Sequence, residues 1–338
     1  MKLKKILFLI KERIHDVEYG ITSGLYNSAH FVVEFLKSYG IESKLVSVVD
    51  GNQVDKEVTN YNPDIIVLEA LWVTPAKLQE LVNIKRHQNR RWVIRIHSKA
   101  PFLANEGVAT AWIRDYTRIN SSRIFLAPNT SELTNQLKSA FPKGRFITLP
   151  NLYKFESSTF KSKKKSSVVD VGCFGAIRPM KNQYLQALAA IDFANRHGLK
   201  LRFHINGTRV EQKGDNVLKN IRILFQDRYE LVEHGWMDHS QFLKTISKMD
   251  FGCQVSFSES FNIVSADFVQ AGVPIVVSDD IEWMPGILRV SPTEWGKISQ
   301  KMSMVYKFRK ILVPLQSLYL KWYEFKAEWI WINKFLPL

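Results

Sequence analysis

Hydrophobic residues follow two alternating patterns in the first 150 residues. Short apolar runs, typical of buried strands, are separated by segments in which apolar residues recur every three or four positions. One such segment is Leu25–Tyr39, where Phe31 and Phe35 fall on one face of the expected helix. The strands expected here are Lys5–Ile10, Lys44–Val49, Asp64–Leu68, Trp92–His97, Arg123–Ala127 and Phe146–Leu149. Strands that alternate with helices predict parallel βαβ units.

The pattern is interrupted between residues 155 and 167. This segment is rich in Ser and Lys, so we expect a linker there. Alternation then resumes, with strands expected at Val168–Phe174, Lys200–Ile205, Leu231–His234, Phe251–Val255 and Pro274–Val277. The helices expected between them are Gln183–Arg196, Ser240–Met249 and Asn262–Ala271. We therefore predict an α/β protein with two Rossmann-like domains and a ligand cleft between the carboxyl ends of their sheets.

The domain boundaries follow from the same pattern. An N-terminal domain is expected over residues 1–154, a linker over 155–167 and a second domain over 168–300. Residues 301–338 have a helical, aromatic-rich pattern, and we expect this tail to pack back toward the N-terminal domain.

Composition narrows the class of protein. The chain has 338 residues, of which 46% are hydrophobic and 23% charged, which excludes a mostly disordered chain and fits two domains. Its two cysteines, Cys173 and Cys253, are too few for a disulfide framework or a four-ligand zinc site. Each lies in an apolar run, so we expect buried, unreactive thiols.

Charge and the amino terminus bear on location. The apolar run Ile6–Ile10 is too short for the core of a signal peptide, and no stretch approaches the ~20 apolar residues that span a bilayer. We therefore expect a cytoplasmic protein without an integral membrane segment. Its net charge of +15 favours polyanionic partners such as nucleic acid, acidic glycans or an anionic membrane, although a solvated basic surface has the same composition.

The most informative segment is residues 256–278, which reads as a strand end, a loop, a helix and a further strand. Glu259 lies at the junction of loop and helix. The backbone N–H groups of Ser260, Phe261 and Asn262 are expected at the helix start, where a diphosphate can bind. Asp267 follows at most ~12 Å further along the helix axis. Two acids on either side of an anion site could hold hydroxyls at both ends of a nucleotide sugar.

This segment resembles the donor-binding signature of glycosyltransferase family 4, a family of retaining enzymes with the GT-B fold. The positions that match in register are Glu259, Phe261, Gly272, Pro274 and Ser278. Asn262 stands where the family has Gly, and Asp267 where it has a second Glu. The resemblance implies that Glu259 contacts donor-sugar hydroxyls and that Asp267 contacts the ribose. An ordinary helix with an acidic N-terminus is the alternative interpretation.

A second segment agrees with this resemblance. The family has Gly-Arg, four residues and then Lys-Gly, and here Gly175 and Lys181 have that spacing. Ala176 occupies the Arg position, so the resemblance assigns the donor diphosphate to Lys181, with Arg178 as a relocated partner. Fixed cations and a helix N-terminus can neutralise a pyrophosphate leaving group, so we expect neither a metal nor a cofactor. Two solvated surface charges beside a helix start are the alternative.

Weaker matches complete the resemblance. Gly207 ends a strand of the second domain, and His234 ends the next, where the family passes its nucleotide-base pocket. Gly20 and Gly24 precede a helix where the family has a Gly-rich loop on the acceptor side. His97 stands where the family often has a His beside the donor sugar, although a lone His at a strand end is as often structural.

Two basic segments indicate a polyanionic acceptor, which GT-B enzymes bind mainly through the first domain. Residues 83–99 contain six Lys or Arg and no acid, and the tail from Lys301 contains seven basic and two acidic residues. Arg95, which shares a strand face with His97, and Lys99 are the candidate acceptor contacts. The run Gly175–Gln183 also resembles glycosyltransferases of bacteriophages, some of which modify hydroxymethylated pyrimidines in DNA. Such an acceptor would need base flipping or groove insertion.

The sequence thus predicts a retaining, metal-independent glycosyltransferase that uses a nucleotide sugar, with a UDP-sugar expected first and hydroxymethylated DNA as the first acceptor. One alternative is transfer to a cell-envelope glycan or lipid-linked sugar, with the basic, Trp-containing tail in peripheral contact with an anionic leaflet. Another is a sugar-nucleotide epimerase of the same fold, against which the signature in residues 256–278 argues.

Overall fold

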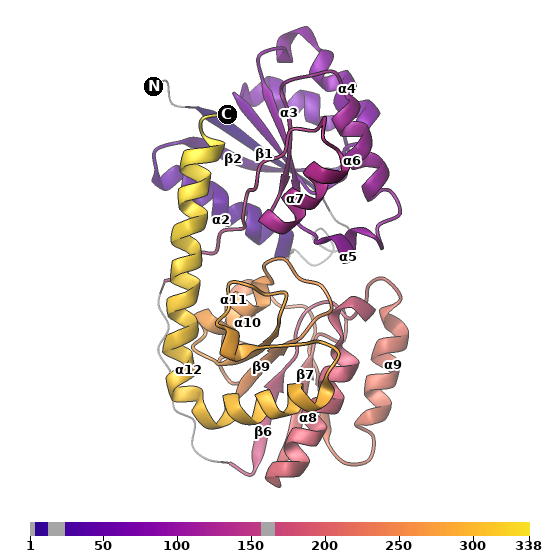
Figure 1. Cartoon of the computed structure of the whole chain (residues 1–338), viewed down its shortest axis with the longest axis vertical. Helices are drawn as coiled ribbons and strands as arrows, with labels where there is room; N and C mark the ends of the chain where they lie inside the picture. Colours follow the sequence, from indigo (N-terminus) through magenta and orange to yellow (C-terminus); the bar gives the residue numbers. More distant parts are fainter. Residues whose placement is uncertain (1–3, 13–23, 157–165) are drawn as a thin grey trace. The chain divides into compact units, whose positions relative to one another are not determined.

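The computed structural model describes residues 4–12, 24–156 and 166–338. The chain divides into two compact units. Unit 1 consists of Met1–Lys154 together with Glu324–Leu338, and unit 2 of Phe155–Tyr323. Each unit is built on its own parallel sheet (Figure 1).

The described strands of unit 1 form a sheet in the order β2-β1-β3-β4-β5. They are β1 (Lys5–Lys11), β2 (Glu42–Val48), β3 (Ile65–Glu69), β4 (Arg91–Ile96) and β5 (Ile124–Pro128). The helices are α2 (Gly24–Ser38), α3 (Gln53–Tyr61), α4 (Pro75–Asn83), α5 (Ala100–Leu103), α6 (Ala109–Arg118) and α7 (Ser131–Ala140), with a 3₁₀ turn at Lys85–His87. Strands β1, β3 and β4 are almost wholly apolar because helices cover both faces of the sheet.

The described strands of unit 2 form a second parallel sheet, in the order β11-β10-β9-β6-β7-β8. They are β6 (Val168–Gly172), β7 (Lys200–Ile205), β8 (Glu230–Glu233), β9 (Phe251–Gln254), β10 (Ile275–Ser278) and β11 (Arg289–Val290). The helices are α8 (Gln183–His197), α9 (Gly214–Leu224), α10 (His239–Ile246), α11 (Ile263–Gln270) and α12 (Trp295–Ile330). Short 3₁₀ turns lie at Pro179–Lys181 and Gly286–Leu288. The part of α12 from Glu324 onward, and the π-helical turn at Trp331–Phe335 that follows it, belong to unit 1.

The predicted α/β class with two parallel-sheet units is confirmed, and the predicted strands agree with the structure except one. Phe146–Leu149 is not a strand: it makes a single bridge, between Phe146 and Leu126 of β5. Pro128, at the end of β5, has no N–H to continue a ladder, and Pro150 has none on the other side. The two cysteines are buried as expected, and burial raises the pKa of the Cys173 thiol to about 12.

Strand order determines where each unit can hold a ligand. In a doubly wound sheet the crevice lies beyond the carboxyl ends of the two strands between which the winding reverses. In unit 1 these strands are β1 and β3, and in unit 2 they are β6 and β9. The loop after β6 carries Lys181 and the loop after β9 carries Glu259, so the fold of unit 2 brings together two residues 78 positions apart.

Helix α11 approaches the sheet of unit 2 closely enough to require glycine beneath it. A Cβ atom on Gly252 of β9 would lie 2.7 Å from the ring of Phe268, and one on Gly172 of β6 would lie 2.8 Å from the same ring. Phe268 is fully buried and cannot move aside. These glycines therefore set the height of α11 above the strands.

We expect Gly252→Ala to lower the free energy of unfolding by about 1–3 kcal/mol, because the added methyl overpacks the contact with Phe268. The matched control is Gly296→Ala in α12, where a Cβ meets nothing within 4 Å. That change should be neutral or stabilise by up to ~1 kcal/mol. Urea unfolding of both variants checks this, and an undiminished stability of Gly252→Ala would contradict it.

Candidate functional site

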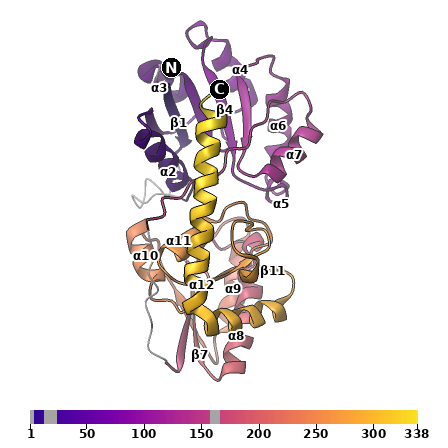
Figure 2. The same ribbon diagram turned by 60° about the vertical axis from the view of Figure 1, so that its left-hand side comes forward.

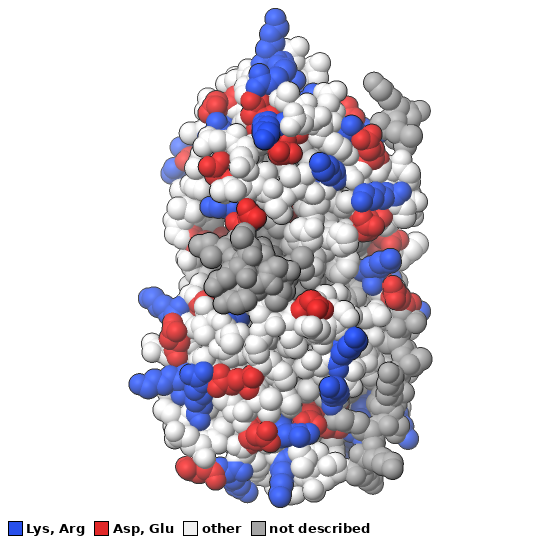
Figure 3. All heavy atoms as spheres, turned by 180° about the vertical axis from the view of Figure 1, so that it is seen from behind, with Lys and Arg blue, Asp and Glu red and all other residues white. Residues whose placement is uncertain are grey.

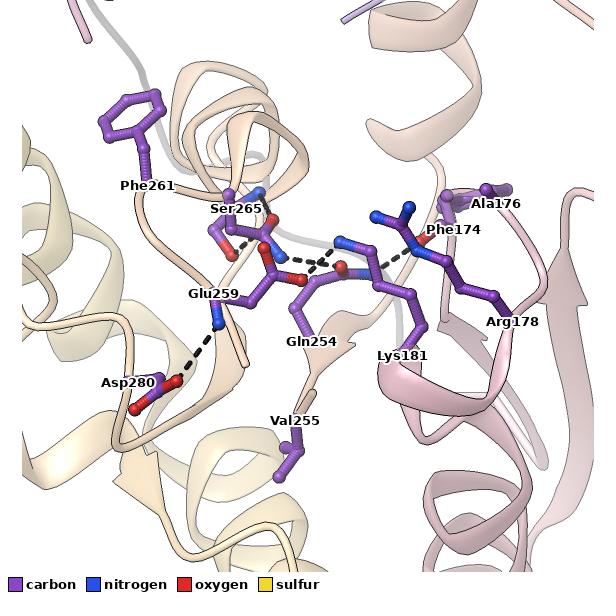
Figure 4. Close-up of polar contacts among 12 residues, drawn as sticks. Phe174, Ala176, Arg178, Lys181, Gln254, Val255, Glu259, Phe261, Ser265 and Asp280 are labelled. Atoms are coloured by element: carbon purple, nitrogen blue, oxygen red, sulfur yellow. Dashed lines mark hydrogen bonds and ion pairs between the residues drawn. The ribbon is translucent and has the colours of Figure 1, made fainter. Parts of the chain in front are cut away.

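Lys181 and Glu259 form the centre of the candidate site in unit 2. The Lys181 ammonium makes an ion pair with the Glu259 carboxylate, and both side chains are largely buried, at 13% and 10% exposure. Figure 4 shows Lys181 and Arg178 extending from one loop, with Glu259 facing Lys181. Arg178 Nη1 lies 3.4 Å from an oxygen of Glu211, so a carboxylate accompanies each cation.

Two loops present these side chains, and both contain an Asn in the left-handed region. Asn182, with φ 56°, precedes α8, and Asn262, with φ 57°, precedes α11. Both stand where the resembling family has Gly. Asn adopts this conformation more readily than other residues with a Cβ. Asn182 and Asn262 therefore adopt a conformation that glycine also adopts readily. Gly175, with φ 111°, keeps the glycine.

The Asn side chains also tie the loops to the sheet. Asn182 Nδ2 donates to the carbonyls of Val255 (3.1 Å) and Pro292 (2.8 Å). Asn262 Nδ2 donates to Gln254 Oε1 (3.0 Å), and Asn262 Oδ1 accepts from the backbone N–H of Ser265 (2.9 Å). Gln254 Nε2 in turn donates to the carbonyl of Phe174 (2.7 Å), so one chain of hydrogen bonds joins the loops after β6 and β9 (Figure 4).

The start of α11 differs from the expected one. The helix begins at Ile263, so Ser260 and Phe261 precede it rather than form its first turn. The side chain of Phe261 is 3% exposed and packs against Trp283 and Tyr323, with ring centroids 5.5 and 5.1 Å away. The ring anchors the loop, and the contact expected between the backbone N–H of Phe261 and a diphosphate stays a prediction.

The Asp267 carboxylate has a hydrogen-bond partner that the sequence did not indicate. Asp267 is 3% exposed, and its Oδ1 accepts a hydrogen bond from His239 Nε2 of α10 at 2.7 Å. This hydrogen bond raises the pKa of His239 above its ordinary value, against the opposing effect of burial. A ribose contact of Asp267 stays a prediction, and His239 is a second candidate for it.

A pair of stacked imidazoles lies beside β7 and β8. His204 Nε2 lies 3.0 Å from Asp170 Oδ1, and His204 Nδ1 lies 2.9 Å from His234 Nε2. Burial and the neighbouring His204 lower the pKa of His234, so His234 is neutral at pH 7. Gly207 lies so close to Glu233 that a Cβ would be 2.1 Å from its carboxylate.

In unit 1, His97 faces a cavity at the carboxyl end of the sheet. The cavity has a volume of about 300 Å³ and is lined among others by Glu69, Trp72 and His97. His97 Nε2 donates to Glu69 Oε2 at 2.7 Å. Burial and the Arg95 charge lower the pKa of His97, and the Glu69 carboxylate, which acts in the opposite direction, does not compensate for them. The imidazole is therefore neutral. Gly24 is the first residue of α2, and Gly20 lies outside the described residues.

Arg95 corrects an expectation about the acceptor. Its side chain is 0% exposed, donates to Glu69 (3.0 and 3.2 Å) and Asn151 (2.8 Å), and lies 5.2 Å from the ring of Trp331. A guanidinium enclosed in this way cannot be a surface contact. Lys99 is 6% exposed, with its Nζ 2.9 Å from Glu132, and is equally unsuited to that role.

Two other cations of residues 83–99 have hydrogen-bond partners. Arg86 pairs with Asp55, and Arg90 donates to Asn62 and to the carbonyl of Pro63. On the face drawn in Figure 3, Lys and Arg side chains alternate with Asp and Glu rather than gather in one patch. A polyanion-binding surface formed by residues 83–99 stays a prediction, and Arg95 and Lys99 are too deeply buried to belong to it.

Sequence reasoning missed several residues of these sites. Glu69 ends an apolar strand next to β4, and a carboxylate at that edge is the signal that could have indicated a partner for His97. Asp280 accepts from the backbone N–H of Glu259 at 3.1 Å and Asn206 from that of Gly175 at 2.7 Å, and no spacing rule indicates either contact. Within the described residues, no group of three or more His, Cys, Asp or Glu side chains is arranged to hold a metal ion.

The architecture is that of known GT-B proteins. A sucrose-phosphate synthase from Thermosynechococcus elongatus is similar with a TM-score of 0.72 and 12% identity, over 99% of this chain and 98% of that one. The trehalose-6-phosphate synthase OtsA is similar with a TM-score of 0.69 and 10% identity, over 99% of each chain. S. aureus TarM, in complex with fondaparinux, α-GlcNAc-glycerol and UDP, has a TM-score of 0.54 and 15% identity.

The match with TarM covers 80% of this chain but 52% of the TarM chain, so this chain spans about half the length of that protein. No family model and no curated protein matches the sequence. At such low identities the likeness concerns the fold, and it confirms the expected GT-B fold.

One prediction from the buried charges concerns Arg95. We expect Arg95→Met to lower the free energy of unfolding by about 3–5 kcal/mol, because it leaves the buried Glu69 carboxylate without its cation. Arg118→Met is the control, since Arg118 is 67% exposed. The double variant Arg95→Met/Glu69→Leu should recover part of the loss. Urea unfolding measures all three, and a loss below ~1 kcal/mol for Arg95→Met would contradict the prediction.

Another prediction concerns the pH dependence of stability. Because the folded pKa of His239 is raised above the ordinary value of 6.5, its contact with Asp267 contributes full stability below pH 6.5. That stability is lost as the pH rises through the raised pKa. The stability difference between the parent and His239→Gln should thus be largest in acid and shrink in alkali, as urea unfolding across pH would show. A pH-independent difference would refute this, and His30→Gln is the control.

Proposed function

We propose that the protein is a retaining, metal-independent glycosyltransferase that takes its sugar from a nucleotide donor, with a UDP-sugar first. The observation that carries this proposal is the pairing of Lys181 and Glu259 on the loops after β6 and β9, at the switch point of the unit 2 sheet. The shared fold supports it, because TarM, one of the similar structures, contains UDP.

In this proposal the donor diphosphate replaces Glu259 as the partner of Lys181. The released Glu259 carboxylate then accepts hydrogen bonds from the donor-sugar hydroxyls, while Lys181 and Arg178 neutralise the departing phosphate. The acceptor hydroxyl attacks the anomeric carbon on the face that the phosphate leaves. The new C–O bond forms as the bond to phosphate breaks, and the hydroxyl proton passes to a phosphate oxygen, so no protein nucleophile is needed.

His234, at the end of β8, is the candidate contact for the nucleotide base. Its imidazole is neutral at pH 7, because burial and the neighbouring His204 lower its pKa, so one ring nitrogen donates and the other accepts. The N3–H of uracil is a donor that an accepting ring nitrogen can bind.

For the acceptor, the structure supports a carbohydrate or lipid-linked hydroxyl more than DNA. Hydroxymethylated DNA was favoured by the basic residues 83–99, and Arg95 and Lys99 among them are buried. The net charge of +15 and the basic tail are the observations that still favour DNA. An epimerase of the same fold would need no acceptor, which separates it experimentally from a transferase.

We expect Lys181→Ala to reduce sugar transfer and donor hydrolysis by at least ~100-fold, because the leaving diphosphate loses its nearest cation. Mass spectrometry would measure both, with UDP-, ADP-, GDP- and TDP-sugars and with hydroxymethylcytosine DNA, hydroxymethyluracil DNA, oligosaccharide or no acceptor present. Lys219→Ala, an exposed change on α9, is the control.

The outcomes distinguish the hypotheses. Near-normal turnover of Lys181→Ala would refute the role of Lys181. A DNA mass gain of one sugar would establish the DNA acceptor, and interconversion of donor sugars without transfer would establish the epimerase. No turnover of any donor by the parent protein would overturn the proposed function.

A further inference from the structure

The outward face of α12 carries a stripe of large apolar side chains. It consists of Ile311, Leu318, Trp322, Phe325 and Trp329, which are 69%, 63%, 56%, 69% and 53% exposed. They follow each other at intervals of seven, four, three and four residues, which places them on one side of a helix. Figure 2 shows this helix in front. We call these five residues the outer stripe.

The opposite side of the same helix is already packed. Leu312, Val313, Leu320 and Ala327 are at most 3% exposed. The outer stripe is therefore not the core-facing side of an ordinary amphipathic helix, because α12 has a second apolar face. Buried apolar residues lie on one side of α12 and exposed apolar residues on the other, although packing against the rest of the chain requires only one apolar side.

The stripe has the area of the apolar surface patches that often have a function. An aromatic side chain has about 150–250 Å² of surface, so Trp322, Phe325 and Trp329 alone expose on the order of 350 Å². The largest apolar patch on a typical soluble monomer measures about 300–600 Å² and is often a contact site. Single exposed residues such as Ile223 and Ile287 elsewhere in the chain form no such row.

The charges beside the stripe have one sign. Beyond the kink at Phe308, the exposed charged residues of α12 are all lysines: Lys310, Lys321 and Lys326. Glu324 and Glu328 are less exposed, and burial raises the pKa of Glu328. A face with Trp and Phe along its centre and lysines at its edges is complementary to a surface that is apolar inside and anionic outside.

We infer that the outer stripe of α12 docks the protein on an anionic lipid surface. The Trp and Phe side chains enter the interfacial region, where amphipathic aromatic rings are favoured, and the lysines reach the headgroup phosphates. The contact is peripheral, since no helix among the described residues has the length and apolarity to span a bilayer. The inference does not depend on the proposed chemistry, because it concerns residues outside the Lys181 site.

A second copy of the chain fits the stripe less well. With Phe308 and Leu315 added, the spacing matches that of a coiled coil. Two such faces would, however, bring two rows of lysines together in a protein that already has a net charge of +15. Double-stranded DNA would use the lysines but leave the apolar stripe in water.

The test is co-sedimentation of the full chain with vesicles, without any sugar donor. We expect binding to vesicles with about one third phosphatidylglycerol, at least tenfold weaker binding to pure phosphatidylcholine, and a blue shift of Trp fluorescence on binding. Phe325→Ser/Trp329→Ser should reduce binding at least tenfold, and Lys310→Gln/Lys321→Gln should reduce it and its salt dependence. Ile223→Ser/Ile287→Ser is the matched control for loss of exposed apolar residues and should bind as the parent does.

Circular dichroism and donor hydrolysis would establish that the variants are folded. Unchanged vesicle binding of Phe325→Ser/Trp329→Ser would overturn the inference, as would equal binding of the parent to neutral and anionic vesicles. A concentration-dependent dimer in analytical ultracentrifugation that the same variant abolishes would instead assign the stripe to a second copy. Binding to a DNA duplex, but not to vesicles, would also overturn it. A protein that binds vesicles yet turns over no donor would leave the docking intact and refute only the proposed function.

Discussion

A positive charge enclosed in unit 1 is the constraint on which the rest of that unit depends. A guanidinium removed from water is tolerated only when its charge and its N–H groups are satisfied. The Nη groups of Arg95 obtain this from Glu69 and Asn151, and the guanidinium lies beside the ring of Trp331, whereas its Nε–H is buried without a hydrogen-bond partner among the described residues. Together with burial, the Arg95 charge lowers the pKa of His97, so the imidazole beside the cavity is neutral.

In unit 2, the comparable constraint acts on the backbone conformation of two loops. Its two loops must turn sharply after β6 and β9 to direct Lys181 and Glu259 toward each other. Asn182 and Asn262 adopt the required left-handed conformation, and their side chains also fasten the loops to the sheet, which glycine could not do. The side-chain hydrogen bonds of the two Asn residues thus restrict the loops more than glycine at the same positions would.

The periodicity of the sequence was sufficient for the α/β class and for nearly all of the predicted strands, because buried parallel strands are continuous apolar runs. It failed at Phe146–Leu149, where prolines prevent a ladder that the apolar residues suggest. The motif residues Lys181 and Glu259 could be identified by spacing. The partners Glu69, His239 and Asp280 could not, because contacts between residues far apart in sequence depend on packing that no local pattern encodes. Arg95 was misjudged for the same reason, since burial of a charge is decided by its partners.

The position of Trp331 in unit 1 has a consequence for how the chain folds during synthesis. Trp331 is fully buried, and its Nε1 donates to the carbonyl of Pro150 at 2.9 Å. On the ribosome, N-terminal domains usually fold before the rest of the chain emerges. Here residues 4–154 reach that stage with the Arg95 charge uncovered on one side, and the whole of unit 2 is translated before Trp331 can cover it. Because of this order of translation, unit 1 passes through an early, incomplete form. In that form the charged core around Arg95 is open to chaperones.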